Sequence, residues 1–201
     1  MKLLHIDSSA LGQYSVTREL TAAVVAQYRD REANLDVTYR DLAADPLPHW
    51  APLGNDPAAL SPEQAAQAQT NEAVMQEFLA ADVLVIGAPM YNFGIPSTLK
   101  AWIDRVAVAG RTFRYTANGP EGLAGNKKVL IASARGGYYA GTPNAAADFQ
   151  EAYLRQALGF LGLTDIEFVR AEGIGMGPEQ RAAAIAAAHT AIKAQPLSLA
   201  A

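Results

Sequence analysis

Short apolar runs alternate with amphipathic segments along the whole chain. The runs at 3–7, 83–87 and 129–133 are typical of strands in a parallel sheet, whose two faces are both covered. The segments 35–40 and 165–171 complete a set of five predicted strands. Helical spacing of apolar residues between the strands predicts helices at 15–30, 61–80, 97–109, 149–161 and 179–194. Strands that alternate with helices imply right-handed crossovers, so we expect an α/β fold in three layers.

Two of these helices carry clear local signals. The start of the second helix combines a hydroxyl cap at Ser61, a proline at 62 and an early acid at Glu63. The third helix shows one apolar stripe, formed by Leu99, Trp102, Ile103 and Val106.

Two segments do not fit the alternation of strands and helices. Residues 44–62 hold five of the eleven prolines and are interpreted as a long ordered loop. Residues 111–126 form an excursion with one possible short strand at 112–115 and a turn at 118–120. No repeat and no low-complexity linker divides the chain, so residues 1–201 are expected to form a single domain.

Composition excludes several classes of function. The net charge is −4 and the longest basic run is Lys127-Lys128, which argues against a nucleic-acid partner. The absence of cysteine excludes disulfides, thiolate catalysis and a Cys-based metal site, and we expect no metal. The N-terminal residues are too charged for an export signal, and the longest apolar stretch is less than half of a membrane span. We therefore expect a cytoplasmic protein with no membrane span.

Parallel α/β sheets bind ligands beyond the carboxyl ends of their strands, which directs attention to three loops. The first loop, 8–17, offers the hydroxyls of Ser9, Ser15 and Thr17 beside a helix N-terminus, an arrangement that suits a phosphate. Hydroxyls that merely cap the helix would produce the same pattern.

The second loop, 88–96, follows the central strand and presents Met90, Tyr91 and Phe93 between two prolines. Such apolar side chains suit a flat heteroaromatic ring, although they could instead cover the end of the sheet. In the third loop, 133–139, Gly136 and Gly137 allow a close backbone approach to a ligand.

These loops together resemble the FMN-dependent NADH-azoreductase family of flavodoxin-like quinone reductases. The most specific match is the segment 88–93, Ala-Pro-Met-Tyr-Asn-Phe. Further matching stretches are 8–9, 14–17, 110–115, 118–123, 134–137, 171–174 and 177–179, so the likeness spans nearly the whole chain. The resemblance implies a flavodoxin-like sheet of five parallel strands in the order 2-1-3-4-5.

The resemblance also implies which residues bind FMN. Ser9, Ser15, Val16 and Thr17 would hold the phosphate, and Ala134, Arg135, Gly136 and Gly137 would approach the pyrimidine edge of the flavin. The ribityl chain and the isoalloxazine ring would be lined by Met90, Tyr91, Asn92 and Phe93. The chain departs from the family at Ala134, where a hydroxyl residue is frequent, and at Gly94, where a polar residue is frequent.

The implied activity is the NADH- or NADPH-dependent reduction of quinones and aromatic azo compounds by a ping-pong mechanism. No side chain is expected to act as a catalytic acid, since the flavin carries the chemistry. A homodimer is implied as well, and exposed aromatic residues on predicted loops agree with it, namely Phe113, Tyr115, Tyr138 and Tyr139. These four residues could instead pack on their own domain.

Other interpretations of the same sequence remain open. A flavodoxin-type electron carrier would bind FMN without oxidising NAD(P)H itself, but such carriers are typically shorter and more acidic. A phospho-receiver domain needs an aspartate at the end of the third strand, where this chain has Ala88-Pro89, and a serine hydrolase needs a G-x-S-x-G turn, which is absent. His5, His49 and His189 are not predicted to be catalytic.

Overall fold

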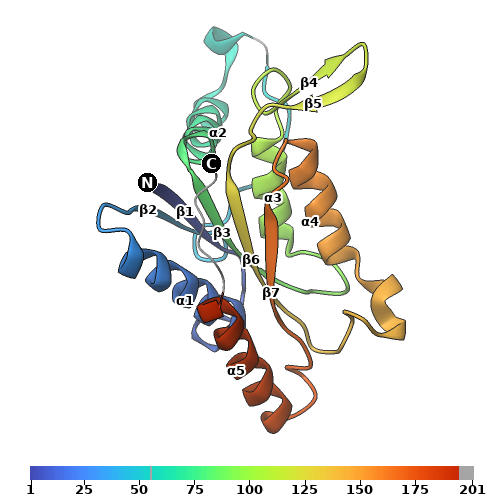
Figure 1. Ribbon diagram of the computed structural model, residues 1–201. Coiled ribbons are helices and arrows are strands. Elements are labelled where there is room, and N and C mark those ends of the chain that lie inside the picture. The colour runs from blue at the N-terminus through green and yellow to red at the C-terminus, as the bar shows by residue number, and fades with distance from the viewer. Residues whose placement is uncertain (55, 195–201) are drawn as a thin grey trace.

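A parallel sheet forms the centre of the computed structural model, which describes residues 1–54 and 56–194 (Figure 1). Its five strands lie in the order β2-β1-β3-β6-β7, and every neighbouring pair is parallel. The bounds are β1 (Lys2–Asp7), β2 (Asp36–Asp41), β3 (Val83–Pro89), β6 (Lys128–Ala134) and β7 (Ile166–Ala171). Because β6 and β7 are the fourth and fifth strands of this sheet along the chain, the predicted strand order is confirmed.

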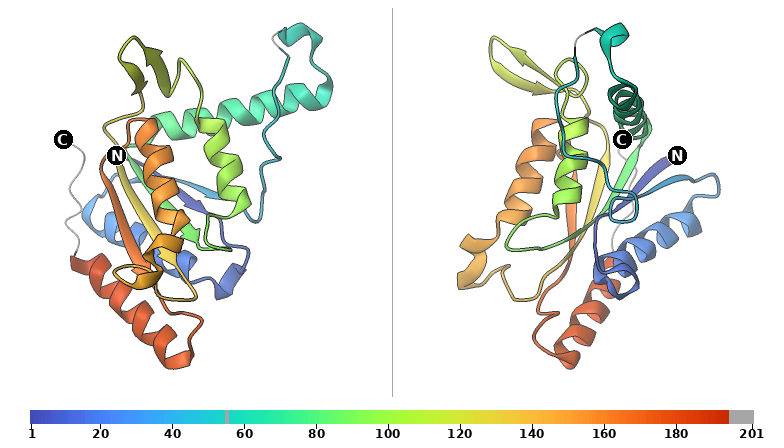
Figure 2. Two further views of the ribbon diagram at one scale, coloured as in Figure 1. Left: turned by 90° about the vertical axis from the view of Figure 1, so that its right-hand side faces the viewer. Right: turned by 180° about the vertical axis from the view of Figure 1, so that it is seen from behind.

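Helices cover both faces of the sheet (Figures 1 and 2). One face packs against α1 (Val16–Arg31) and α5 (Pro178–Ala194), and the other against α2 (Pro62–Ala80), α3 (Ser97–Val106) and α4 (Phe149–Phe160). Three short 3-10 helices complete the set, η1 (Gly12–Tyr14), η2 (Pro57–Ala59) and η3 (Pro143–Ala147). Since β3 and β6 are buried along their full length, each contributes alternate side chains to both hydrophobic cores.

The ends of two helices follow from local chemistry. Ser61 caps α2 and exchanges side-chain and backbone hydrogen bonds with Gln64, which forms a capping box. The predicted apolar stripe of α3 is buried, but the helix ends at Val106, three residues earlier than expected. The helix ends there because the Thr112 hydroxyl donates to the Val106 carbonyl at 2.5 Å. In addition, the Thr112 amide donates to the Val108 carbonyl. These bonds turn the chain into the next segment.

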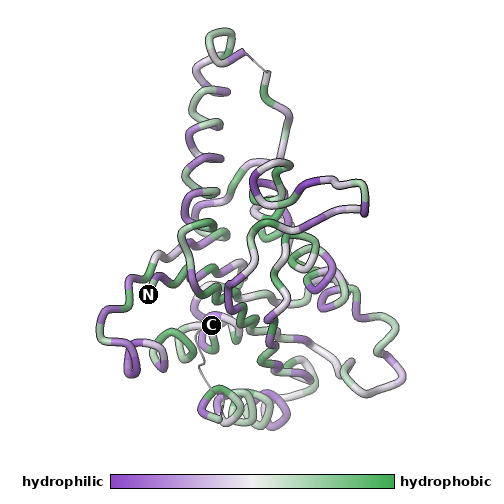
Figure 3. Tube along the Cα trace, turned by 45° about the horizontal axis from the view of Figure 1, so that its top comes forward, coloured by the Kyte–Doolittle hydropathy of each residue, from purple (hydrophilic) through white to green (hydrophobic). Residues whose placement is uncertain are grey.

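Two elements project from the sheet and its helices. Only Val74, Met75 and Phe78 are buried in α2, so the N-terminal half of that helix extends beyond the core (Figure 2). Figure 3 shows hydrophilic positions recurring along this helix, whereas hydrophobic positions gather in the central strands. The excursion predicted at 111–126 is an antiparallel hairpin of two strands, β4 (Phe113–Thr116) and β5 (Gly119–Gly122), rather than one.

The hairpin is attached to α4 by a very close backbone contact. A Cβ atom at Gly122 would lie 2.1 Å from the amide nitrogen of Gly162, so only glycine fits there. The amide of Ala124 donates to the Leu161 carbonyl at 2.9 Å and extends this contact. Across the described residues, no helix is both long and apolar enough to cross a membrane.

Candidate functional site

The loops that follow β1, β3 and β6 lie side by side, because these three strands are neighbours in the sheet. The phenol oxygen of Tyr91 in the second loop accepts from the Ala10 amide at 3.1 Å and lies 3.4 Å from Ser9 Oγ in the first loop. The amide of Met90 donates to the Ala134 carbonyl at 2.9 Å, which joins the second loop to the third. The structure thus brings together the three segments that the sequence singled out.

The first loop ends at the N-terminus of α1, where two backbone donors have no partner. Ser15 caps the helix by accepting from the Arg18 amide, so its capping role is confirmed. Within residues 1–54 and 56–194, the amides of Val16 and Thr17 donate to no protein group. The Ser15 and Thr17 hydroxyls lie 3.1 Å apart beside them. Free amides, hydroxyls and the positive end of the helix dipole together form a site suited to a phosphate group.

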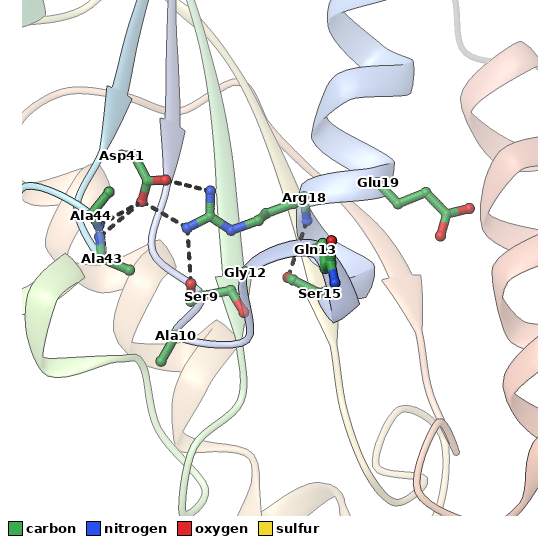
Figure 4. A pocket seen from close by; sticks show the side chains of 10 residues that line it. All are labelled: Ser9, Ala10, Gly12, Gln13, Ser15, Arg18, Glu19, Asp41, Ala43 and Ala44. Carbon is green, nitrogen blue, oxygen red and sulfur yellow. Dashed lines mark hydrogen bonds and ion pairs between the residues drawn. The ribbon is translucent and has the colours of Figure 1, made fainter.

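A pocket of about 620 Å³ opens beside this loop (Figure 4). Arg18 spans one side of it and binds both carboxylate oxygens of Asp41 at 2.6 and 2.7 Å. The same guanidinium donates to the Ser9 carbonyl at 3.0 Å, which ties the first loop to the end of β2. The lining residues are Ser9, Ala10, Gly12, Gln13, Ser15, Arg18, Glu19, Asp41, Ala43 and Ala44.

The pair of Arg18 and Asp41 leaves little net charge in this pocket. The guanidinium, aided by the amides of Ala43 and Ala44, lowers the pKa of Asp41 from its ordinary value near 3.8 to about 2. The carboxylate in turn raises the pKa of Arg18. Since both groups stay charged and paired, an anion bound here would interact mainly with neutral donors and with the helix dipole.

A buried carboxylate at the end of β1, that of Asp7, supports the first loop. Asp7 accepts from the hydroxyl of Thr21 at 2.9 Å and from that of Tyr39 at 3.1 Å. Burial, together with the nearby Asp7, raises the pKa of Tyr39 to about 12, so this phenol remains a hydrogen-bond donor. A side chain at Gly87 would lie 2.5 Å from Asp7, and glycine in β3 therefore makes room for the carboxylate.

The second loop contains a tight turn with unusual backbone geometry. Tyr91 and Gly94 exchange two hydrogen bonds, of 3.0 and 3.1 Å, around Asn92 and Phe93. Both central residues have positive φ, 49° for Asn92 and 71° for Phe93. Asparagine tolerates this region, but a bulky side chain there is strained by about 1–2 kcal/mol. Strain of this kind is concentrated at functional sites.

The turn also presents unpaired donors. Neither the Asn92 nor the Phe93 amide has a hydrogen-bond partner in the part of the chain that the structure describes. The amide of Met90, in contrast, is already occupied by Ala134. Among the described residues, the two amides at the tip of the turn are therefore free to bind a ligand.

The third loop is open above its two glycines. A Cβ atom at Gly136 would meet no atom within 4 Å, and the amides of Gly136 and Gly137 have no partner among the described residues. The carbonyls of the two glycines are occupied. The Gly137 carbonyl accepts from the Gly173 amide, and the Gly136 carbonyl accepts from the Gly175 amide. The segment that follows β7 thus holds the third loop in place and leaves its amides available.

The side chain of Arg135 points away from the open side of this loop. It is fully buried and forms ion pairs with Asp148 at 2.9 Å, with Glu172 at 3.0 Å and with Glu151. Glu172 also accepts from the amides of Tyr139 and Ala140. The amide of Arg135 donates to the Ala171 carbonyl and its carbonyl accepts from the Ile174 amide, so the backbone of this residue is occupied as well. The guanidinium of Arg135 therefore acts as a support for the loop.

Further polar and charged side chains near Arg135 complete this network. Ser133 Oγ accepts from Arg135 Nε at 3.0 Å and donates to Gln150 Oε1. The hydroxyl one position before Ala134 is therefore already paired. Burial opposes ionisation of Glu151, but its hydrogen bonds to Arg170 and the charge of Arg135 outweigh that effect, and the net pKa of Glu151 is lowered.

Large apolar side chains surround the carboxyl edge. Tyr14 is 73% exposed, Phe93 51% and Phe149 64%, although all are large enough to be favoured in a core. Together with Leu11, Tyr138 and Met176, they come from segments that follow four different strands, β1, β3, β6 and β7. Exposed apolar side chains gathered as a rim at one edge are typical of interaction surfaces.

Several residues considered from sequence lie away from this edge or are paired. His5 is buried in β1 beside Asp7, His189 lies 2.8 Å from Glu19, and His49 lines a separate pocket with Trp50. Arg111 and Arg114 pair with Glu72 and Glu121. Sequence reasoning missed Arg18, Asp41 and Glu172 as supports of the loops, because their partners are distant along the chain.

Comparison with known families places this geometry in context. The model of a family described as having a flavodoxin-like fold matches residues 1–195. The chain is 65% identical over 188 residues to FMN-dependent NADH:quinone oxidoreductase 1 of Xanthomonas euvesicatoria, with 94% of this chain and 93% of the relative covered. It is 58% identical over 200 residues to FMN-dependent NADH:quinone oxidoreductase 2 of Pseudomonas aeruginosa, with 97% and 98% covered.

Solved structures show the same likeness. The crystal structure of an azoreductase from Bacillus anthracis superposes with a TM-score of 0.83 at 31% identity, covering 96% of each chain. The azoreductase AzrA superposes with a TM-score of 0.84 at 32% identity, covering 96% of this chain and 97% of the other.

Proposed function

The chain belongs to the flavodoxin-like family that includes the FMN-dependent NADH:quinone oxidoreductases, and on that premise we propose that it is itself such an enzyme. The observation that supports this most directly is the set of unpaired amides that three adjacent loops present at one edge. They belong to Val16 and Thr17, to Asn92 and Phe93, and to Gly136 and Gly137. A phosphate at one end and a flat polar ring at the other would use donors of this kind.

Each loop would contribute a different part of the FMN site. The amides of Val16 and Thr17 bind the phosphate, with the hydroxyls of Ser9, Ser15 and Thr17 around it. Met90, Tyr91, Asn92 and Phe93 line the ribityl chain and the ring, and the two amides at the tip of the turn reach its polar edge. Ala134, Arg135, Gly136 and Gly137 would approach the pyrimidine edge, where the amides of the two glycines are the donors without a partner among the described residues.

The chemistry that bound FMN supplies is the acceptance of hydride from NADH or NADPH and the delivery of two electrons to a quinone or an aromatic azo compound. The protein positions the cofactor and stabilises charge. The fixed amides of Gly136 and Gly137 would stabilise negative charge at the pyrimidine edge of a bound flavin. No side chain is required as a catalytic acid.

The decisive experiment is an absorbance spectrum of the purified protein, followed by anaerobic addition of NADH. We expect flavin bands that bleach within the mixing time and return when a quinone is added. Bands that persist with both NADH and NADPH would instead indicate an electron carrier. A protein that neither contains nor takes up FMN would contradict the proposal.

We also propose a ping-pong mechanism, in which NAD(P)H and the oxidant use the same open face in turn. The three adjacent loops at one edge support this, because NAD(P)H and the oxidant would both have to reach a flavin bound between them. Initial rates at several fixed quinone concentrations should give parallel double-reciprocal lines. Intersecting lines would show that both substrates are bound at once.

A homodimer is the assembly that the exposed edge favours. Phe113 packs on Phe160 of its own chain, with ring centroids 4.5 Å apart, but Tyr115 and Tyr138 remain 75% and 45% exposed. A second copy would cover these side chains and the apolar rim. Sedimentation at micromolar concentration should give twice the protomer mass, and a monomer would contradict the dimer. We propose the cytoplasm as the location, because it supplies NADH.

A further inference from the structure

Arg105 is a buried arginine without a carboxylate partner. It lies in the last turn of α3 and is 2% exposed. Its Nε donates to Asn71 Oδ1 at 2.8 Å and its Nη1 to the Ala101 carbonyl at 2.8 Å, but its buried Nη2 has no partner. A buried guanidinium that keeps unpaired N–H groups is costly. Arg135, also buried, is by contrast surrounded by three carboxylates.

This guanidinium lines a cavity of about 180 Å³ between α2, the end of α3 and the loop segment at 50–53. Figure 2 shows α2 lying across the end of α3, with that loop passing beside both. The lining is mixed: Trp50, Leu53, Ala68, Met75 and Val108 supply its apolar part, and Asn71, Glu72 and Arg111 line it beside Arg105. The cavity lies at the opposite end of α3 from Ser97, where the helix begins next to the second loop, and so it is separate from the proposed FMN site.

The other charges around the cavity are already paired. Glu72 binds Arg111 through both oxygens, at 2.5 and 3.0 Å, and Asp104 binds Lys100 at 2.5 Å. Within residues 1–54 and 56–194, the charge of Arg105 is therefore left without a carboxylate counterpart. Its surroundings lower the pKa of Arg105 by desolvation, which an anion at this position would offset.

We propose that this cavity binds a small organic carboxylate with an apolar body. The carboxylate accepts from Arg105 Nη2, and the apolar body lies against Trp50, Leu53 and Met75. Because Nη2 is buried, side chains of the lining must shift for the carboxylate to reach it. The cavity is smaller than the roughly 300–1,000 Å³ typical of sites for drug-sized ligands, so the ligand is small.

Tryptophan fluorescence tests this in the FMN-loaded protein. Sodium benzoate, titrated at constant ionic strength, should cause a saturable change, whereas benzamide, which has the same shape without the charge, should not. Trp50→Phe should remove the signal, because the other tryptophan, Trp102, is fully buried against Phe78. An equal response to benzamide would overturn the proposal.

Two variants test whether benzoate binds in this cavity and through this guanidinium. Arg105→Met should weaken benzoate binding about 10- to 100-fold, the loss expected for one hydrogen bond to a charged group. Its flavin spectrum should stay unchanged. Ala68→Leu fills the cavity and keeps the charge, and it should weaken binding as well. Unchanged benzoate affinity in both variants would show that the cavity holds only water.

The thermal midpoint gives a second readout. Benzoate should raise it in the native protein and not in Arg105→Met. Sedimentation at two protein concentrations identifies the source of the carboxylate. If Arg105→Met weakens self-association and benzoate does the same to the native protein, the carboxylate belongs to a second copy, and the proposal of a free ligand is wrong.

Discussion

The first and third loops present similar groups to a ligand but are supported in different ways. Both expose backbone amides, and both are held from behind by an arginine. Arg18 behind the first loop is partly exposed and has one close carboxylate partner, Asp41. Arg135 behind the third loop is fully buried among Asp148, Glu151 and Glu172. Burial is thus the main difference between the two supports.

This difference in burial predicts different consequences for the free energy of unfolding and for FMN binding. A buried charge network is strongly destabilised by the loss of one member, whereas a partly exposed ion pair contributes modestly. We therefore expect the shape of the third loop to be coupled to the stability of the whole protein. The shape of the first loop should affect FMN binding more than unfolding.

The largest effect is expected for Arg135→Met. Removing the guanidinium leaves three carboxylates close together, which should lower the free energy of unfolding by about 3–5 kcal/mol. Urea denaturation measures this. Arg114→Met is the matched control, because the Arg114 and Glu121 pair is exposed on the hairpin, and its midpoint should stay near that of the native protein. Equal midpoints for the two variants would contradict the comparison.

A smaller effect on the free energy of unfolding is expected when acid protonates Asp41, which supports the first loop. The pKa of Asp41 is about 2 in the folded protein and near 3.8 without its partners, so folding favours the charged form. This stabilisation is complete above pH 4 and is lost as the pH falls from about 4 to 2, and it amounts to about 1–2 kcal/mol. Unfolding free energies measured from pH 5 to pH 2 should decrease less in Asp41→Asn.

Glu72 provides the control for this titration. Its pKa is also lowered to about 2, by Arg111, but its side chain is about half exposed and solvent screens the pair. Glu72→Gln should therefore leave the acid dependence close to that of the native protein. A flatter profile in Glu72→Gln than in Asp41→Asn would contradict the assignment to the first loop.

Ser15→Ala tests the proposed phosphate site. The loss of the helix cap should lower the free energy of unfolding by about 1 kcal/mol. FMN affinity, measured by fluorescence titration of the apoprotein, should fall as well, because the hydroxyl lies beside the free amides. Ser61→Ala removes the cap of α2 at a similar cost and should leave FMN affinity unchanged. Equal FMN affinity in both variants would place the phosphate elsewhere.

The smallest effect is expected in the second loop. Phe93→Gly relieves the strain of a positive φ but increases the entropy of the unfolded chain, and the net gain should be about 0.5 kcal/mol. Phe93→Ala removes the same ring and keeps the strained backbone, so it should show no gain. Thermal unfolding of both apoproteins compares them. A gain in Phe93→Ala would show that the ring, rather than the backbone, is the source of strain.

The order and type of the main elements could be predicted because local patterns determine them. The fully apolar run at 83–87 could only be a covered strand, and Ser61-Pro62 begins α2 where its capping chemistry indicated. The three ligand loops could be found because the carboxyl ends of parallel strands share one edge. The early end of α3 could not be predicted, because it depends on a hydroxyl six residues further along, that of Thr112.

By itself, the sequence determined the class of fold and the segments that form the candidate site, since these depend on periodicity and on residue type near each strand end. Its resemblance to a known family implied the order of the strands in the sheet. Only the tertiary structure decided which groups in those segments are free. It directs Arg135 into a network with Glu151 and Glu172, occupies the Met90 amide and leaves those of Asn92 and Phe93 unpaired. The reason is physical: hydrogen bonds and ion pairs join groups that are close in space, and residues 16 to 37 positions apart become neighbours only when the strands pair.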